Sequence, residues 1–412
     1  MNLPQIELIP LRPVVSSDRP STLDLLVKIV PPAQAIDLKR PALNIGFVID
    51  RSGSMSGQKI ESARQAACYA VQQLQMSDRV SVTIFDDQVE TLVPSTPAIE
   101  KSSITRKIEG IQPRGSTALH AGWLEGGVQV SQYLNPEQIN RVLLLSDGLA
   151  NVGETNPDTI ASDVHGLAKR GVSTSTMGVG NDYSEDLLEV IARSGDGNYY
   201  YIESPQQLPE IFQTELQGLM ATVGHTVSLG IEPQAGVEVV DVFNDFDVNR
   251  QGDYQLPNLV VGNSIEVVMR LKVPAMTQAT DLCFFRLAWN DPNQEQRQVQ
   301  RMTLQLPAVP FAQLEEFPLN PEVQQQVARL MAARAKEEAV RSLDRGDFAA
   351  AGASLQAARV QMMTAPASGM MAMELKALAD LDTDLASRDV KRARKRATYQ
   401  NYQARRGEGF SS

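Results

Sequence analysis

The stretch that decides the fold is IGFVIDRSGS, residues 45–54. Its first five residues carry no polar side chain, and a glycine-containing turn follows them. Such a run is typical of a buried strand in an α/β sheet. Asp50, Ser52 and Ser54 then come where the strand ends. In open α/β sheets the crevice at that end of the strands is the usual ligand site.

The motif Asp-x-Ser-x-Ser is weak evidence by itself, because Asp and Ser are common turn and helix-cap residues. Two later segments strengthen it. One places Thr117 in a Gly-Ser-Thr loop just before a helix-like segment, and the other places Asp147 directly after the apolar run that ends at Ser146. A sheet built from these strands would bring all of these oxygen-bearing side chains to one edge.

Together these residues closely resemble the metal-ion-dependent adhesion site of von Willebrand factor type A domains, with the resemblance covering about residues 42–220. The metal-binding positions would be Asp50, Ser52, Ser54, Thr117 and Asp147. The resemblance implies that the hydroxyls touch the ion, that the aspartates bind it directly or through water, and that one position stays open. An Asp or Glu of a partner protein fills that position. The implied function is a non-enzymatic, metal-dependent protein-binding module.

The chemistry of the candidate ligands narrows the choice of metal. All of them are oxygens, from two carboxylates and three hydroxyls, and hard oxygen donors select Mg²⁺, Mn²⁺ or Ca²⁺ rather than zinc. Mg²⁺ is the first expectation, with Ca²⁺ and Mn²⁺ as alternatives. Asn151 and Glu154 follow Asp147 near the rim of the expected site. We expect them to be candidates for contact with the partner.

Strand-like and helix-like segments alternate over residues 41–220. This alternation predicts an α/β fold with a doubly wound, mostly parallel sheet and right-handed crossovers, similar to a Rossmann fold. Within it, Thr96-Pro97 predicts the start of a helix, because a capping residue is followed by proline at the first helical position.

Strand-like segments separated by turns occupy residues 221–310 and indicate a β-sandwich. The two strand-like segments within residues 1–40 cannot stand alone, so we expect them to complete this sandwich, with the α/β domain inserted between. Residues 318–408 are helix-like, and their last helix is expected over residues 371–406. The arrangement is similar to that of bacterial proteins related to inter-α-trypsin inhibitor heavy chains and to calcium-activated chloride channel proteins.

Composition bounds the function and the compartment. The 412 residues carry a net charge of −11, which argues against general nucleic-acid binding. The basic run at residues 391–396 is interpreted as a solvated helix end. No apolar run reaches the length of about 18 residues that a membrane span needs, and the N-terminus does not resemble a signal peptide. A cytoplasmic protein is therefore expected.

Two other functions remain open. In the first, the protein is a structural scaffold in which the metal only stabilises loops. In the second, Ser56 is the nucleophile of a serine hydrolase. The segment GSMSG at residues 53–57 lacks the centred Gly-x-Ser-x-Gly spacing of a nucleophile elbow. The three histidines are also poorly placed, because His120 and His165 fall in helix-like segments and His225 lies beyond the α/β domain.

Overall fold

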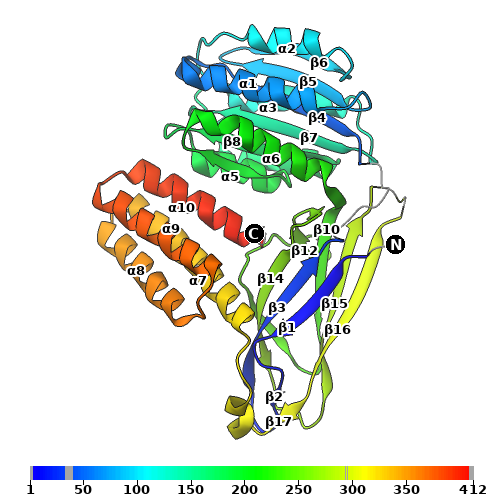
Figure 1. Ribbon diagram of the computed structural model, residues 1–412, viewed down its shortest axis with the longest axis vertical. Coiled ribbons are helices and arrows are strands. Elements are labelled where there is room, and N and C mark those ends of the chain that lie inside the picture. The colour runs from blue at the N-terminus through cyan, green and yellow to red at the C-terminus, as the bar shows by residue number, and fades with distance from the viewer. Residues whose placement is uncertain (1–2, 33–39, 293, 295, 408–412) are drawn as a thin grey trace. The chain divides into compact units, whose positions relative to one another are not determined.

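The computed structural model describes residues 3–32, 40–292, 294 and 296–407. The chain divides into two compact units. One unit is Lys39–Ala221, and the other combines Met1–Leu38 with Thr222–Ser412. The chain therefore leaves the second unit, builds the first and returns (Figure 1).

The unit Lys39–Ala221 is built on a six-stranded sheet with the strand order β6-β5-β4-β7-β8-β9. All neighbouring strands are parallel except β5 and β6, which are antiparallel. This confirms the predicted mostly parallel sheet. The strands are β4 (Leu43–Asp50), β5 (Arg79–Phe85), β6 (Val89–Pro97), β7 (Ile139–Ser146), β8 (Val172–Val179) and β9 (Tyr199–Ile202).

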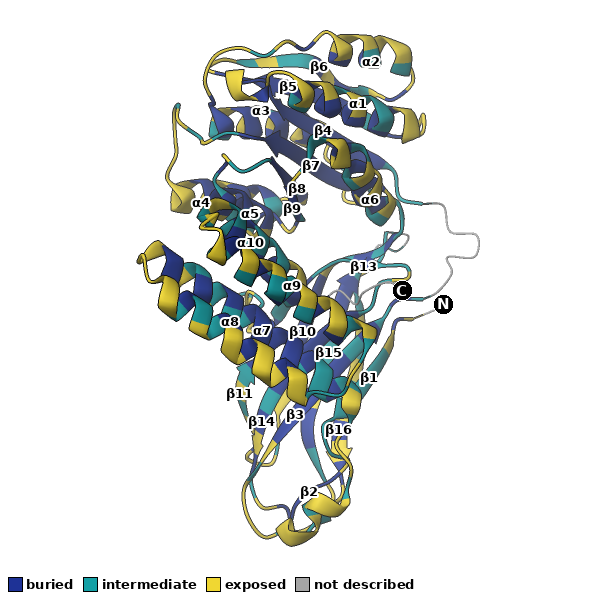
Figure 2. Cartoon of the chain, turned by 60° about the vertical axis from the view of Figure 1, so that its left-hand side comes forward, coloured by how far each residue is buried: buried dark blue, intermediate teal, exposed yellow. Residues whose placement is uncertain are grey.

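Helices cover both faces of this sheet (Figure 1). They are α1 (Gln58–Gln73), α2 (Lys101–Glu109), α3 (Leu119–Ser131), α4 (Pro157–Ala168), α5 (Glu185–Ser194) and α6 (Leu208–Met220), with short 3-10 turns η1 (Gly53–Met55) and η2 (Pro205–Gln207). Strand β4 is buried along its whole length (Figure 2). Its side chains alternate between the two layers. Phe47 stacks on Phe212 of α6, whereas Val48 lies against Gly126 of α3. Asp50 belongs to the same alternating series as Val48.

The prediction of a helix start at Thr96-Pro97 is wrong. Strand β6 continues to Pro97, which pairs with Arg79, and α2 begins only at Lys101. Because β6 is the edge strand of the sheet, proline costs no hydrogen bond on its open side. The Ala98 N–H then donates to the Asp78 carbonyl oxygen over 2.8 Å, which holds the chain in this extended path.

The other unit contains a β-sandwich of two antiparallel sheets, ordered β1-β3-β14-β11 and β12-β10-β15-β16, with β13 paired to β10. Strand β3 lies in the middle of the first sheet and pairs with β14 from Ser21↔Val273 to Ile29↔Ile265. The segments before and after the α/β unit therefore share one sheet, as the insertion into a sandwich predicts. The strands are β1 (Gln5–Pro10), β2 (Val15–Ser16), β3 (Ser21–Val30), β10 (Thr222–Pro233), β11 (Glu238–Val242), β12 (Tyr254–Leu256), β13 (Leu259–Val260), β14 (Ile265–Val273), β15 (Thr280–Asn290), β16 (Gln298–Leu306) and β17 (Ala308–Val309).

Helices complete this unit. They are η3 (Phe311–Glu316), α7 (Pro321–Asp344), α8 (Phe348–Thr364), α9 (Gly369–Ala386) and α10 (Val390–Arg405). The prediction of a single last helix over residues 371–406 is wrong, because the helical backbone is interrupted between α9 and α10. Arg388 there has a left-handed backbone, and the Asp389 carboxylate accepts the Arg392 N–H over 3.2 Å to cap α10.

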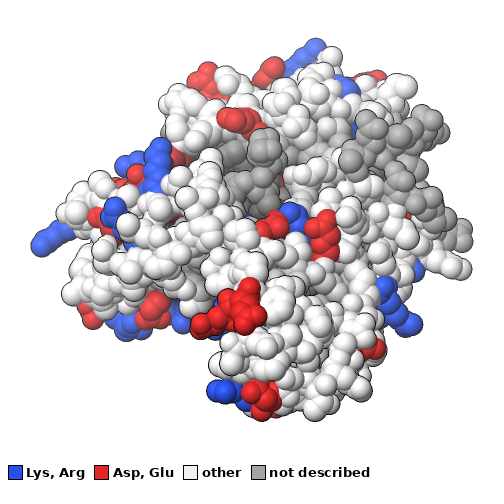
Figure 3. Space-filling view, turned by 60° about the horizontal axis from the view of Figure 1, so that its bottom comes forward, with Lys and Arg blue, Asp and Glu red and all other residues white. Residues whose placement is uncertain are grey.

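The basic run of α10 is largely engaged inside the helical part. Arg394 pairs with Asp344 over 2.8 Å, Arg396 pairs with Asp384 over 3.0 Å, and Lys395 is buried. On the face drawn in Figure 3, basic and acidic side chains are interspersed. The interpretation of this run as a solvated helix end is therefore wrong, because the run lies in the N-terminal half of α10 and several of its side chains are paired or buried. Among the residues that the structure describes, every helix is too short or too polar to traverse a lipid bilayer.

Candidate metal centre

The candidate site lies where the central strands of the parallel sheet end. Asp50 is the last residue of β4, and Asp147 directly follows β7. These two strands are parallel neighbours, with Ile49 paired to Leu145, so both carboxylates lie at the same edge. Both side chains are fully buried. Two buried carboxylates at one edge repel each other and need positive charge nearby.

Asp50 is held by hydrogen bonds that do not neutralise its charge. Its Oδ1 accepts the Ser52 N–H over 2.7 Å, and its Oδ2 accepts the Ser146 hydroxyl over 2.6 Å. The pKa of Asp50 is raised to about 6, chiefly because the side chain is buried; the nearby Asp147 also raises the pKa, whereas the hydrogen bonds from Ser146 and Ser52 lower it. The carboxylate is therefore fixed in place but electrostatically uncompensated.

Asp147 is joined to the motif that follows Asp50. Its Oδ1 accepts the Ser54 hydroxyl over 2.7 Å, and its Oδ2 forms an ion pair with the Lys59 ammonium in the first turn of α1. The Ser52 and Ser54 hydroxyls are themselves 3.1 Å apart. The two serines and Asp147 thus form one continuous chain of polar contacts.

Thr117 enters the site on a loop that other loops hold in place. The Gly53 N–H donates to the Gly115 carbonyl oxygen over 3.1 Å, which ties the Thr117 loop to the Asp50 loop. On its other side, Asn151 accepts the Thr117 N–H at its Oδ1 over 2.9 Å and returns its own N–H to the Thr117 carbonyl oxygen over 3.1 Å. Thr117 itself is buried. Protein hydrogen bonds therefore fix the position of this loop.

The space around Gly148 shows that the candidate ligands converge. A Cβ atom on Gly148 would lie 3.1 Å from the Thr117 Oγ1, 3.4 Å from the Ser54 Oγ and 3.8 Å from the Asp50 Oδ2. Three of the five predicted ligands thus face one small space, and Ser54 links that space to Ser52 and Asp147. A side chain at this position would project into the space between these oxygens.

This donor set fits a hard divalent cation. Two carboxylates and three hydroxyls are oxygen ligands of the kind that Mg²⁺, Mn²⁺ and Ca²⁺ take. Within the described residues, no group of three or more His, Cys, Asp or Glu side chains is placed to hold a metal. A site at the β4–β7 edge therefore relies on hydroxyls for more than half of its protein ligands.

Asp86 directly follows the neighbouring strand β5 and has a different electrostatic environment. Its Oδ2 lies 2.9 Å from the Arg51 Nε and 2.7 Å from the Arg114 Nε, and its Oδ1 accepts the Gln88 N–H. Burial alone would raise the pKa of Asp86, but the Arg114 hydrogen bond, the Gln88 N–H and the Arg51 charge outweigh it and lower the pKa. Asp86 is the anchor of two arginines, not a free metal ligand.

The two rim residues have local structural partners. Asn151 holds the Thr117 loop, as described above. The Glu154 Oε1 accepts the N–H groups of Thr155 and Asn156 over 2.9 and 2.8 Å, just before α4. Both side chains are exposed, so contact with a partner remains a prediction.

The hydrolase alternative has no support in the geometry. The Ser56 hydroxyl donates to the Gly53 carbonyl oxygen over 2.7 Å. His120 is bonded to Asp163 over 3.0 Å. In the described part of the chain, no hydrogen bond connects Ser56 to a histidine. A serine nucleophile needs such a base.

Two residues of this centre, Lys59 and Ser146, were not among those predicted from the sequence. Ser146 directly precedes Asp147, and a hydroxyl at the end of a strand next to the candidate carboxylate was the available signal. Lys59 lies five residues after Ser54 in the first turn of a helix. A lysine there opposes the helix dipole, and this unfavourable placement was the only hint that it serves another charge.

Comparisons with known proteins agree with this architecture. Residues 44–214 match the von Willebrand factor type A domain family. The chain is 29% identical to the uncharacterized protein YfbK of Escherichia coli (strain K12) over 302 residues, which cover 69% of this chain and 51% of YfbK. It is 28% identical to human inter-alpha-trypsin inhibitor heavy chain H3 over 200 residues, 46% of this chain and 22% of that protein. The chain thus spans about half of YfbK's length and less of the heavy chain's.

A solved structure extends the likeness to most of the chain. The von Willebrand factor type A protein from Catenulispora acidiphila superposes with a TM-score of 0.72 at 17% identity, covering 92% of this chain and 90% of that one. At this identity the match shows the fold alone. The matched residues 44–214 coincide with the α/β unit that carries the centre at the β4–β7 edge. This chain therefore contains a von Willebrand factor type A domain, inserted into a β-sandwich.

Proposed function

We propose that the α/β domain binds one divalent cation, Mg²⁺ in the first instance, and through it an acidic side chain of a partner protein. The ligands would be Asp50, Ser52, Ser54, Thr117 and Asp147. The observation that carries the proposal is the convergence of the Thr117, Ser54 and Asp50 oxygens on the space beside Gly148. A bound ion supplies positive charge and a vacant coordination position, and the protein's residues determine where that position lies.

The proposed ligands would leave the positive charge of the ion only partly neutralised. Three of the five donors are neutral hydroxyls, and Asp147 already shares its charge with Lys59. A divalent cation held this way keeps a net attraction for a further carboxylate. Ser54, at the outer side of the site, is exposed, so a ligand from outside the domain can approach there. An Asp or Glu side chain has the required charge and size.

Hydrogen bonds and ion pairs of the protein itself join the loops. Besides the Gly53–Gly115 bond, the Arg114 N–H donates to the Arg51 carbonyl oxygen over 2.7 Å, and both arginine side chains meet Asp86. This independent anchoring disfavours the scaffold alternative, in which the metal serves only to stabilise loops. We therefore propose a non-enzymatic binding module.

The test measures metal binding first and partner capture second. Isothermal titration of the chelator-treated full chain with Mg²⁺ and Mn²⁺ should give one site, and Asp50→Asn should abolish it while circular dichroism stays unchanged. Partner capture with excess Mg²⁺ should then fail for Asp50→Asn and for wild type in chelator. Metal binding without any metal-dependent capture would support the scaffold alternative, and absence of metal binding would refute both.

A further inference from the structure

The outer face of α3 is unusual for a surface helix. Ala121, Leu124 and Val128 are exposed, with 49% of Leu124 and 45% of Val128 accessible. These positions are spaced by three and four residues and therefore lie on one face. Surface helices normally place charged or polar side chains there. An exposed apolar stripe of this kind indicates an interaction surface.

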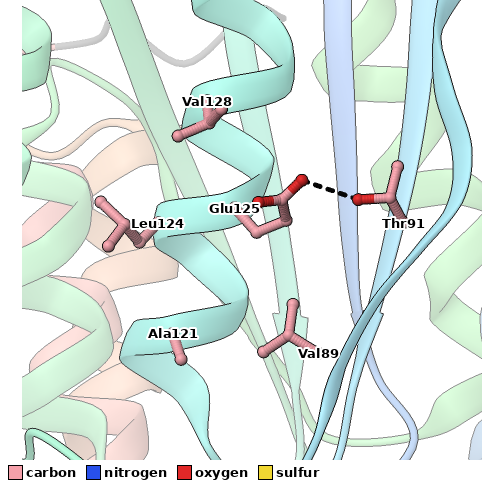
Figure 4. Close-up of a pocket in the computed structure, with 6 residues that line it drawn as sticks. All are labelled: Val89, Thr91, Ala121, Leu124, Glu125 and Val128. Carbon is pink, nitrogen blue, oxygen red and sulfur yellow. Dashed lines mark hydrogen bonds between the residues drawn. The ribbon is translucent and has the colours of Figure 1, made fainter.

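Edge strand β6 lies beside this stripe, and together they line a shallow hollow. Its walls come from Ala121, Leu124 and Val128 on α3 and from Val89 and Thr91 on β6 (Figure 4). The volume of the hollow is about 480 Å³. This is large enough for several side chains of a docked segment.

One charged side chain, Glu125, also lines the hollow. The Glu125 side chain points from α3 toward Thr91 on β6 (Figure 4). Its Oε1 accepts the Thr91 hydroxyl over 2.7 Å and the Gln129 amide over 2.8 Å. The carboxylate is half-buried, and within the described ranges no lysine, arginine or histidine forms an ion pair with it.

The two hydrogen bonds fix Glu125 without neutralising it. Both go to Oε1, so the second oxygen is available to a group from outside the domain. A partly desolvated carboxylate among apolar side chains favours a cation, because the surrounding low dielectric strengthens their attraction. The charge of the hollow thus specifies the charge of its occupant.

We propose that this hollow docks a segment of a partner protein that carries a lysine or arginine among apolar side chains. The apolar side chains cover Leu124 and Val128, and the cationic group binds Glu125. Arginine suits the second Glu125 oxygen well, because its guanidinium offers several donors in one plane.

The hollow is a proposed binding surface separate from the metal centre. None of its lining residues belongs to the candidate ligand set. The end of the hollow lined by Val89 and Ala121 nevertheless lies toward the same edge of the sheet, because Val89 follows the Asp86 turn and α3 begins two residues after Thr117. The inference therefore stands whether or not the metal binds, and binding at the hollow is expected to persist in chelator.

The experiment selects random dodecapeptides on the wild-type chain in chelator and measures the enriched peptides by fluorescence anisotropy. We expect enriched peptides with a lysine or arginine between apolar residues. Glu125→Gln should weaken their binding about fivefold, as expected for loss of one partly exposed ion pair. Leu124→Ser should weaken it about tenfold through lost apolar burial.

Met76 provides a matched control, since it is 74% exposed and lies outside the hollow. Met76→Ser should leave peptide binding unchanged, and circular dichroism should show that all three variants are folded. The proposal is overturned if the peptides bind Glu125→Gln and Leu124→Ser as tightly as wild type. It is also overturned if the selection yields no binder, or only peptides without a basic residue.

Discussion

Two carboxylates at the ends of adjacent strands have opposite electrostatic environments. Asp50 ends β4 and Asp86 immediately follows β5, and both side chains are fully buried. Asp86 meets two arginines and its pKa is lowered, whereas Asp50 meets hydroxyls and an N–H group and its pKa is raised to about 6. The protein supplies the cation for Asp86 itself. At Asp50 the proposed divalent cation would supply the positive charge.

The largest loss of stability is expected for substitution of Asp86, the carboxylate that pairs with two arginines. Asp86→Asn leaves the buried Arg51 without its main partner, and breaking a buried pair costs about 3–5 kcal/mol of unfolding free energy. Urea unfolding should show this loss equally in Mg²⁺ and in chelator, because the pair is independent of the metal. A loss below about 1 kcal/mol would show that Asp86 and Asp50 are not the contrasting pair described here.

In the absence of metal, Asp50→Asn should instead increase the free energy of unfolding at neutral pH. The folded-state pKa of about 6 lies above the ordinary value of 3.8, so the folded protein holds this proton more tightly than the unfolded chain. The resulting stabilisation is fully present below pH 3.8 and is lost as the pH rises through 6. At pH 7.5 the ionised Asp50 then costs about 3 kcal/mol.

Chemical denaturation in chelator at several pH values measures this effect. Asp50→Asn should be more stable than wild type above pH 6, and the difference should vanish toward pH 4. Mg²⁺ should stabilise wild type but not the variant. Equal stability of the two proteins at pH 7.5 in chelator would contradict an uncompensated Asp50.

Lys59 partly neutralises the negative charge of the centre and should therefore lower its affinity for a divalent cation. It pairs with Asp147 at the site, so removal of its charge reduces repulsion of a divalent cation. Lys59→Met should raise Mg²⁺ affinity about tenfold, and Lys59→Arg should retain the wild-type affinity. Isothermal titration gives both values. A weaker Mg²⁺ affinity in Lys59→Met would mean that Lys59 organises the ligands instead of competing with the ion.

Gly148→Ala should give the smallest change in Mg²⁺ affinity, and the change should be confined to the metal centre. The added methyl group would lie 3.1 Å from the Thr117 Oγ1 and 3.4 Å from the Ser54 Oγ. We expect Mg²⁺ affinity to fall about fivefold while the unfolding free energy changes by no more than about 1 kcal/mol. Gly166→Ala is a control, because no atom lies within 4 Å of its added Cβ. An unchanged affinity in Gly148→Ala would place the ion away from these hydroxyls.

The sequence predicted the fold well where local pattern and tertiary structure agree. The run before Asp50 and the one before Asp147 are continuous apolar strands, and a parallel sheet necessarily brings their ends to one edge. Thr96-Pro97 was mispredicted because a position at the edge of the sheet decided the outcome. The break at Arg388 depends on a cap at Asp389 within a strongly helical segment, and periodicity alone does not reveal it.

The gathering of the candidate ligands at one edge of the sheet could be predicted from the sequence, but the charges around them could not. Asp50, Thr117 and Asp147 carry strand-end and loop signals that can be read along the chain. Whether a carboxylate is neutralised depends on side chains that arrive from elsewhere, such as Lys59 from the first turn of α1 and Arg114 from the Thr117 loop. The different roles of Asp50 and Asp86 emerge only when those contacts are known.

The most direct measurement is an anomalous difference map from a crystal of the wild-type chain soaked in Mn²⁺. We expect one peak between Asp50 and Asp147, about 2.2 Å from the Ser52, Ser54 and Thr117 hydroxyl oxygens, with a ligand position open to solvent. A well-ordered site without such a peak, or a peak bound elsewhere in the domain, would contradict the account.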